Sequence, residues 1–224
     1  MDLNHIIILT GCVIQAYFIK SEYDKKYSQA VILKGLASLY FVILGFRTAA
    51  QCSDPAFASA IRTGLIFGMA GDILLNLRFV FEKQGQKIFL AGILAFLIGH
   101  ILYLKALIPL AQDLMLCIGI GALIAAALLA YIFKTMDVRP AFKIFGVFYL
   151  GAVIIMSVIA VSLLFHSPTT GMKIFALGAV LFMLSDIVLI FNTFGSSTSF
   201  SRRILNLSMY YVGQILIALS LLTF

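Results

Sequence analysis

Eight apolar runs of about twenty residues divide this chain, and the charged residues cluster in the short segments between them. A run of that length, folded as α-helix, crosses the hydrocarbon core of a bilayer. Only 11% of the residues are charged, whereas a soluble domain has about a quarter. Continuous rather than alternating apolar runs favour helices over a β-barrel. The sequence therefore predicts an all-α integral membrane protein with transmembrane helices over residues 4–20, 28–46, 58–80, 88–106, 114–133, 141–165, 172–194 and 203–223.

The basic residues are divided unequally between alternate loops. One set of loops holds eleven of them: Lys20, Lys25, Lys26, Arg78, Lys83, Lys87, Lys134, Arg139, Lys143, Arg202 and Arg203. The other set holds four: Arg47, Arg62, Lys105 and Lys173. Because positively charged loops stay on the cytoplasmic side, we expect both termini on the non-cytoplasmic side of a multi-pass protein, which in a bacterium would lie in the inner membrane. The net charge of +7 is thus a topology signal, and no nucleic-acid partner is expected.

Two aspartates inside apolar runs indicate an internal duplication. Asp72 and Asp186 are 114 residues apart (186 − 72 = 114), and the pairs Gly99-His100 and Gly213-Gln214 have the same offset. An even number of helices in each copy gives both copies the same orientation in the membrane. The loops are too short to hold a soluble domain. We therefore predict one transmembrane domain over residues 1–224, made of two parallel four-helix repeats at 1–110 and 111–224.

Polar side chains from five predicted helices share one level of the membrane. They are Lys34, Asp72, His100, Asp186 and Gln214. Asp72 lies about three residues past the midpoint of its predicted helix, or roughly 4–5 Å from the midplane, and Asp186 lies at the same depth. A charge at that depth costs several kcal/mol unless it is paired or neutralised, and by default it marks a functional site. The candidate catalytic residues are therefore Asp72 and Asp186.

Helical spacing places further polar side chains beside the two aspartates. The candidate supporting or substrate-binding set is Lys34, Asn76, His100, Tyr103, Ser185, Tyr210 and Gln214. Structural interpretations stay open for these residues. Lys34 could extend to the headgroups along its flexible stem or neutralise one aspartate, and His100 could be a hydrogen-bonded packing residue. The remaining members could be interhelical hydrogen bonds.

Two carboxyl groups in a low-dielectric site cannot both ionise cheaply, so an acid and a base lie side by side at neutral pH. This arrangement serves hydrolysis by water, and it serves proton-coupled transport of a small solute equally well. The chain contains neither a Gly-x-Ser-x-Gly nor a His-Glu-x-x-His motif. We expect no cofactor and no metal. The residues alone leave the choice between hydrolase and transporter open.

The motifs around these residues resemble the YhhN-like membrane proteins, a family that includes the lysoplasmalogenases. They are Gly71-Asp72-x-x-Leu75, Gly99-His100-x-x-Tyr103, Ser185-Asp186-x-x-Leu189 and Tyr210-Tyr211-x-x-Gln214, with Tyr149 and Met156 as further matching positions. The resemblance runs across nearly the whole chain. One departure is Lys34-Gly35-Leu36, where the family has Lys-Pro-Leu.

The resemblance implies hydrolysis of the vinyl ether bond of a lysoplasmalogen to a fatty aldehyde and a glycerophospho-amine, with Asp72 and Asp186 as the catalytic residues and a lysophospholipid as the partner. An acid would protonate the enol ether and a carboxylate would stabilise the oxocarbenium ion and activate water, as in glycosidases. Which aspartate is the acid stays open, although the more polar surroundings of Asp72 favour its ionised form. We expect the headgroup to enter from the basic, cytoplasmic side and the tail to lie among Phe67, Phe96, Phe182 and Met183. The oligomeric state is unknown.

Overall fold

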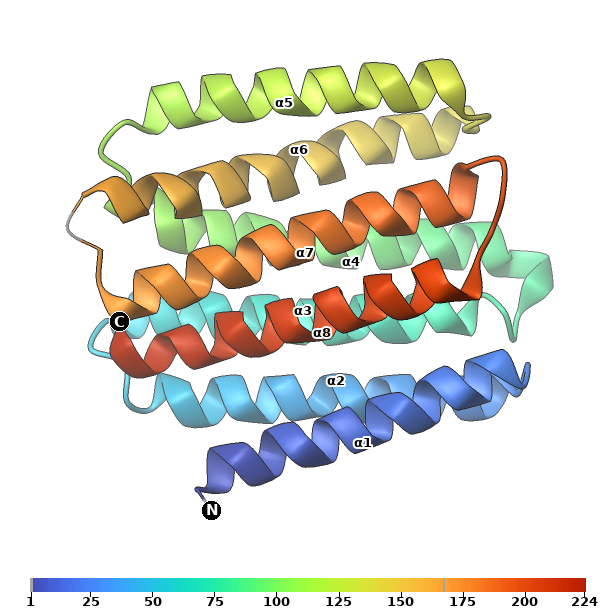
Figure 1. Ribbon diagram of the computed structural model, residues 1–224, viewed down its shortest axis with the longest axis horizontal. Helices are drawn as coiled ribbons and strands as arrows, with labels where there is room; N and C mark the ends of the chain where they lie inside the picture. The colour runs from blue at the N-terminus through green and yellow to red at the C-terminus, as the bar shows by residue number, and fades with distance from the viewer. Residues whose placement is uncertain (1, 167) are drawn as a thin grey trace.

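The computed structural model describes residues 2–166 and 168–224, and within them it confirms the all-helical prediction (Figure 1). Eight α-helices, each long and apolar enough to cross a membrane, occur in this part of the chain together with a few 3₁₀ turns and no strand. The helices are α1 (Leu3–Tyr23), α2 (Tyr27–Ala49), α3 (Pro55–Leu77), α4 (Gly85–Leu107), α5 (Leu114–Thr135), α6 (Pro140–Ser162), α7 (Thr170–Phe194) and α8 (Phe200–Ser220).

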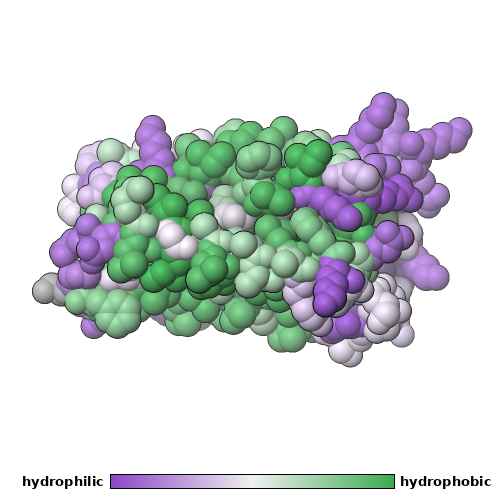
Figure 2. All heavy atoms as spheres, turned by 90° about the horizontal axis from the view of Figure 1, so that it is seen from above, coloured by the Kyte–Doolittle hydropathy of each residue, from purple (hydrophilic) through white to green (hydrophobic). Residues whose placement is uncertain are grey.

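The surface of the bundle has the character of a lipid-facing surface. The helices run side by side along one direction, with both chain ends at the same end of the bundle (Figure 1). Hydrophilic residues gather at the two ends, and an apolar belt separates them (Figure 2). Large apolar side chains in the middle of helices are exposed, including Val13 on α1 and Leu123 on α5. A soluble monomer rarely exposes so large an apolar surface.

The observed start of α3 changes the depth of Asp72 in the membrane from the predicted one. A carboxylate oxygen of Asp54 accepts hydrogen bonds from the N–H groups of Ala56 (2.9 Å) and Phe57 (3.0 Å), and Pro55 occupies the first helical position. Both features favour a helix N-terminus, so α3 begins three residues before the predicted position. Asp72 therefore lies six residues past the helix midpoint at residue 66 (72 − 66 = 6), or about 9 Å. The predicted depth of three residues was wrong, and Asp72 lies nearer the end that carries the eleven basic residues.

Helix contacts fall into two matching sets. In the first half α1 packs on α2 and α3 on α4, and in the second half α5 packs on α6 and α7 on α8. Between the halves, α2 contacts α8 and α6 contacts α4. A pair of glycines lies where α3 crosses α4 and again where α7 crosses α8, since a β-carbon at Gly99 would lie 3.1 Å from the Gly64 carbonyl oxygen and one at Gly178 would lie 2.8 Å from that of Gly213. Small residues allow such close approach. A four-helix duplication would give this pattern, and the division at residues 1–110 and 111–224 remains a proposal.

Candidate active site

Asp72 is the acceptor at the centre of a buried cluster built by α2, α3 and α8. The Nζ atom of Lys34 lies 3.0 Å from Oδ1 of Asp72. The hydroxyl groups of Ser38 and Tyr210 donate to Oδ2 at 2.5 and 2.6 Å. All four side chains are buried. A buried ion pair is tolerated when further hydrogen bonds satisfy the remaining lone pairs, so this cluster is suited to a charged carboxylate.

Lys34 is enclosed by aromatic rings. Its Nζ atom lies 5.0, 4.8 and 4.6 Å from the ring centroids of Phe18, Tyr210 and Tyr211, and its side chain is only 3% exposed. Ring faces stabilise a desolvated ammonium group. The structure therefore places the Lys34 ammonium group on Asp72, where it neutralises the carboxylate, and the alternative of a lysine that extends to the headgroups is wrong.

A chain of hydrogen bonds leads from Asp72 to α4. The Tyr210 hydroxyl group accepts from Nε2 of Gln214 (3.4 Å), and Oε1 of Gln214 accepts from the Tyr103 hydroxyl group (3.1 Å). Gly68 makes room for this chain, since a β-carbon there would lie 2.8 Å from Nε2 of Gln214. These residues fix the orientation of Tyr210, and through it that of Asp72.

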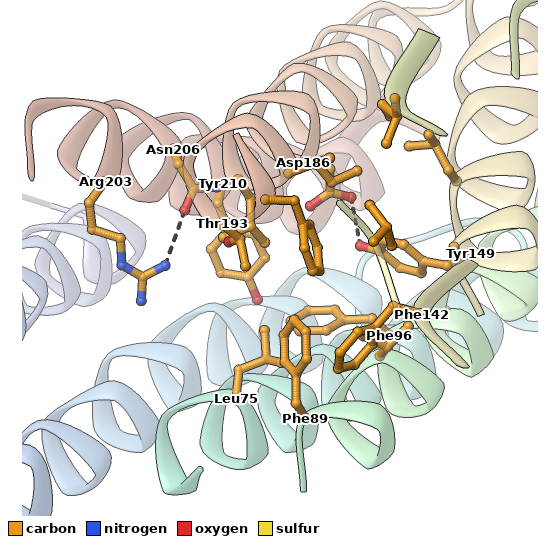
Figure 3. Close-up of a pocket in the computed structure, with 18 of the residues that line it drawn as sticks. Leu75, Phe89, Phe96, Phe142, Tyr149, Asp186, Thr193, Arg203, Asn206 and Tyr210 are labelled. Atoms are coloured by element: carbon orange, nitrogen blue, oxygen red, sulfur yellow. Dashed lines mark hydrogen bonds between the residues drawn. The ribbon is translucent and has the colours of Figure 1, made fainter. Parts of the chain in front are cut away.

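Asp186 has a different set of partners. The Tyr149 hydroxyl group of α6 donates to Oδ2 of Asp186 on α7 at 2.6 Å (Figure 3). Asp186 is 4% exposed. Within the described ranges, none of the ion pairs includes Asp186. The two aspartates therefore differ in charge environment, because Asp72 faces a cation and Asp186 faces a neutral phenol.

Both aspartates line one cavity that extends from them toward the basic end of the bundle, and Figure 3 shows Asp186 among the lining residues. Its volume is about 110 Å³. A single water needs roughly 10–15 Å³ of such volume, so the cavity has room for water and for part of a ligand. Its polar lining consists of Lys34, Asp72, Asn76, Tyr149, Asp186, Thr193, Arg203, Asn206 and Tyr210. The rest of its wall is apolar and includes Phe89, Phe96, Phe133, Phe142 and Phe194.

Several predicted residues lie beside the cavity rather than in its wall. Nδ1 of His100 is hydrogen-bonded to the Phe96 carbonyl oxygen at 2.8 Å, and the hydroxyl group of Ser185 donates to the Phe182 carbonyl oxygen at 2.7 Å. Tyr103 and Gln214 also lie outside the lining. These four residues support the helices and the residues of the cavity.

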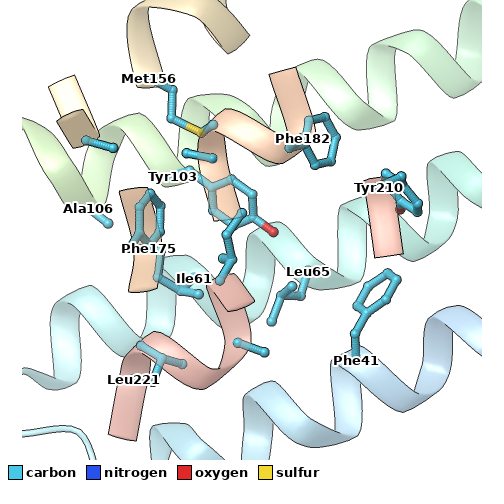
Figure 4. Packing of buried hydrophobic residues seen from close by; sticks show 14 of the residues in the cluster. Phe41, Ile61, Leu65, Tyr103, Ala106, Met156, Phe175, Phe182, Tyr210 and Leu221 are labelled. Atoms are coloured by element: carbon cyan, nitrogen blue, oxygen red, sulfur yellow. The ribbon is translucent and has the colours of Figure 1, made fainter. Parts of the chain in front are cut away.

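The structure does not bring the residues expected around the tail together in the cavity. Of the four residues expected around the tail, only Phe96 lines the cavity that holds the aspartates. Phe182 instead packs in the core, with its ring centroid 4.6 Å from that of His100 and 5.3 Å from that of Tyr210 (Figure 4). Met183 lines a separate groove near the other end of the bundle. The cavity extends toward the basic end, where its wall is built by the ends of α4, α5, α6 and α7.

The model of the YhhN family matches residues 29–221, from α2 to the end of α8. This chain belongs to the YhhN family. No solved structure matches it significantly. The YhhN match includes the whole Asp72 cluster, Tyr149 and Asp186, and it leaves only α1 and the ends of the chain outside.

Sequence reasoning missed several partners in this YhhN protein. Ser38 follows Lys34 by one helical turn, so helical spacing could have identified it. The contacts of Tyr149 with Asp186 and of Arg203 with Glu22 join residues that are 37 and 181 positions apart in the sequence, and no local pattern indicates them. Within residues 2–166 and 168–224, no three His, Cys, Asp or Glu side chains are grouped as a metal ion would require.

Proposed function

We propose that this YhhN protein is a membrane hydrolase that cleaves the vinyl ether bond of lysoplasmalogens, releasing a fatty aldehyde and a glycerophospho-amine. The observation that carries the proposal is the unequal pair of buried aspartates in one cavity, of which Asp72 has a cationic partner and Asp186 has none. Such a pair supplies a base and an acid at the same pH. The resemblance of the family motifs to lysoplasmalogenases supports the choice of substrate.

Asp186 is the acid of the proposed reaction. A buried carboxylate without a cation is costly, so its protonated form is the less costly one. Tyr149 donates to Oδ2, and the proton of Asp186 is therefore carried on Oδ1. Asp186 transfers this proton to the β-carbon of the vinyl ether, and the α-carbon and ether oxygen become an oxocarbenium ion.

Asp72 is the base. Its negative charge stabilises the oxocarbenium ion, and it takes a proton from the water that attacks the α-carbon. The hemiacetal then breaks, because Asp72 returns a proton to the ether oxygen and Asp186 accepts the proton of the hemiacetal hydroxyl group. The products are the aldehyde and the free glycerol hydroxyl group, and both aspartates return to their starting states.

The direction of the cavity supports entry of the lipid from the basic end. A lysophospholipid would place its headgroup toward the basic residues and its apolar chain against the aromatic wall formed by Phe133, Phe142 and Phe194. If positive loops face the cytoplasm in this protein too, the cavity opens toward the cytoplasmic leaflet. This orientation is part of the proposal.

The proposed reaction predicts aldehyde release by the purified protein in detergent. Alkenyl, alkyl and acyl lysophosphatidylethanolamine are supplied in parallel, and aldehyde is measured by coupling to an aldehyde dehydrogenase. We expect aldehyde from the alkenyl lipid alone. Well-folded protein that converts none of the three lipids would exclude lysoplasmalogenase activity. Proton-coupled transport would then be the remaining use of the two aspartates, tested by solute-driven pH changes in proteoliposomes.

Tyr149 is expected to position the acid. Tyr149→Phe removes the donor to Oδ2 of Asp186 and should lower kcat by about tenfold, with KM changed by less than about twofold because the ring remains. The measurement is the rate of aldehyde release over a range of substrate concentrations. Tyr131→Phe is the matched control, since Tyr131 is exposed on α5 and lies outside the cavity. Equal losses in both variants, or a loss confined to KM, would contradict this role.

A further inference from the structure

The cavity wall carries polar groups in three successive levels between the aspartates and the basic end. The hydrogen bond from Tyr210 to Asp72 sets the register of α8 against α3. Because the two helices run in opposite directions, Asn76 on α3 and Asn206 on α8 each lie four residues, or about 6 Å, closer to the basic end. Arg203 lies a further turn along α8. Figure 3 shows Asp186, Tyr210, Asn206 and Arg203 in that order along one side of the cavity.

Asn76 has an acceptor that the protein does not use. Its side chain is 2% exposed and lines the cavity. Nδ2 donates to the Asp72 carbonyl oxygen at 3.2 Å, which fixes the orientation of the amide, since a flipped amide would place two oxygen atoms together. No donor from the described residues reaches Oδ1. A buried acceptor left unpaired is energetically costly, so this atom is suited to a donor supplied by a ligand.

Asn206, which lies at the same level as Asn76, uses both ends of its amide within the protein. Its Nδ2 donates to the Ser185 carbonyl oxygen at 2.8 Å, and its Oδ1 accepts from Arg203 at 3.3 Å. Both ends of its amide are therefore occupied by the protein. Of the two asparagines that line the cavity, Asn76 is the one whose oxygen is available to a ligand.

Arg203 forms the third level of the wall, and Glu22 and Arg78 lie near it without lining the cavity. Arg203 lines the cavity and is paired with Glu22 at 2.9 Å. The guanidinium carbon of Arg78 lies 4.1 Å from the ring centroid of Phe89, a residue of the cavity wall, and no described residue accepts from its Nε. Burial and the nearby charge of Arg203 lower the pKa of Arg78 to about 10. One positive charge therefore remains without a counter-charge at this level, as a site for one anionic group requires.

We propose that this wall is a headgroup subsite, in which Oδ1 of Asn76 accepts a hydrogen bond from the free sn-2 hydroxyl group of a glycerol ether lipid while Arg203 and Arg78 bind its phosphate. The placement of the ether at the aspartates rests on the proposed function. The order of the levels, carboxyl groups then amide then guanidinium groups, matches the order of ether, hydroxyl and phosphate along such a lipid. Asn76 thereby selects lipids with a free sn-2 hydroxyl group, because an acylated lipid has no donor at that position.

The hydroxyl contact is tested with ethers that bind but are not hydrolysed. The probes are a saturated 1-alkyl lysophosphatidylethanolamine and its 2-deoxy analogue, and their affinities are measured by calorimetric titration of the full-length protein in detergent. We expect the lipid with the hydroxyl group to bind wild-type protein about 10- to 100-fold more tightly. Equal affinities in wild-type protein would overturn the proposal, and this comparison requires no variant.

A variant tests whether Asn76 causes the preference for the lipid with the hydroxyl group. Asn76→Leu keeps the size of the side chain and removes its acceptor, so the preference should fall to within about twofold. Asn192→Leu is the matched control: Asn192 also lies on a membrane helix near the basic end, accepts from the Ser199 N–H group, and lies outside the cavity lining. It should keep the wild-type preference. A preference that persists in Asn76→Leu would overturn the assignment.

A second comparison of lipid affinities tests the phosphate contact. Wild-type protein should bind the alkyl lysophospholipid about tenfold or more tightly than the alkylglycerol that lacks phosphate, and Arg78→Gln should reduce that difference. Inorganic phosphate is titrated in parallel. Affinity for inorganic phosphate equal to that for the lipid would identify a free-phosphate site and overturn the headgroup assignment.

Failure of the subsite and failure of the reaction give different results. Aldehyde release from alkenyl lipid without any preference for the hydroxyl group would leave the proposed hydrolysis in place and overturn the subsite. A clear preference for the hydroxyl group, lost in Asn76→Leu, with no aldehyde from the alkenyl lipid would support the subsite and exclude the hydrolysis.

Discussion

Replacing Asp186 with asparagine should lower kcat for aldehyde release by about a thousandfold, since a positioned general acid contributes about 10²–10⁴ in rate. The amide is nearly isosteric and can still accept the hydrogen bond that Tyr149 donates at 2.6 Å, but it has no proton to give to the vinyl ether. Binding of the non-hydrolysable alkyl ether should change little. The measurement is aldehyde release under saturating substrate, compared with the affinity for the alkyl ether.

Asp72→Asn would be a less specific test. It also removes the counter-charge of Lys34, which lies 3.0 Å away and is buried. A loss of activity in Asp72→Asn could therefore come from lost catalysis or from lost stability. Asp186→Asn breaks none of the ion pairs found among the described residues. It should therefore unfold at nearly the wild-type temperature. Asp186→Asn protein that retains more than about a tenth of the wild-type kcat would contradict the assignment of Asp186 as the acid.

The helices of this protein were predictable because lipid imposes one simple rule on the sequence. A spanning segment must be apolar and about twenty residues long, and all eight segments meet that rule. Their ends were less predictable where side chains decide them. Because Asp54 caps α3, this helix begins three residues before the predicted position. The depth of Asp72 therefore differs from the predicted depth, whereas the helix face on which it lies is unchanged.

The candidate site was predictable where its members lie on a common helical face. Asp72 and Asn76 are one turn apart and line the same cavity. Contacts between helices were not predictable in this way, since the pairing of Tyr149 with Asp186 depends on how α6 packs on α7. Most of the residues expected around the tail lie outside the cavity for the same reason, because helical periodicity identifies a face and not the neighbour of that face. The partners that distinguish the two aspartates became visible only in the packed bundle.

Replacing Lys34 with methionine is expected to cause the largest loss of stability. The variant leaves the Asp72 carboxylate buried without a cation, and breaking a buried pair by removing one partner costs about 3–5 kcal/mol. The thermal midpoint, followed in detergent by the helical circular dichroism signal, should fall well below that of wild type. Lys173→Met is the control, since Lys173 is an exposed lysine near the start of α7 and belongs to none of the ion pairs of the described residues.

A double variant separates neutralisation from catalysis. Lys34→Met combined with Asp72→Asn removes both charges of the pair, and replacement of a buried pair by neutral groups is often neutral or stabilising. The double variant should therefore recover most of the lost stability and none of the aldehyde release, because no carboxylate remains to stabilise the oxocarbenium ion. A double variant no more stable than Lys34→Met alone would show that the lysine acts on something other than Asp72. Recovery of activity together with stability would exclude Asp72 from the chemistry and leave its carboxylate with a structural role.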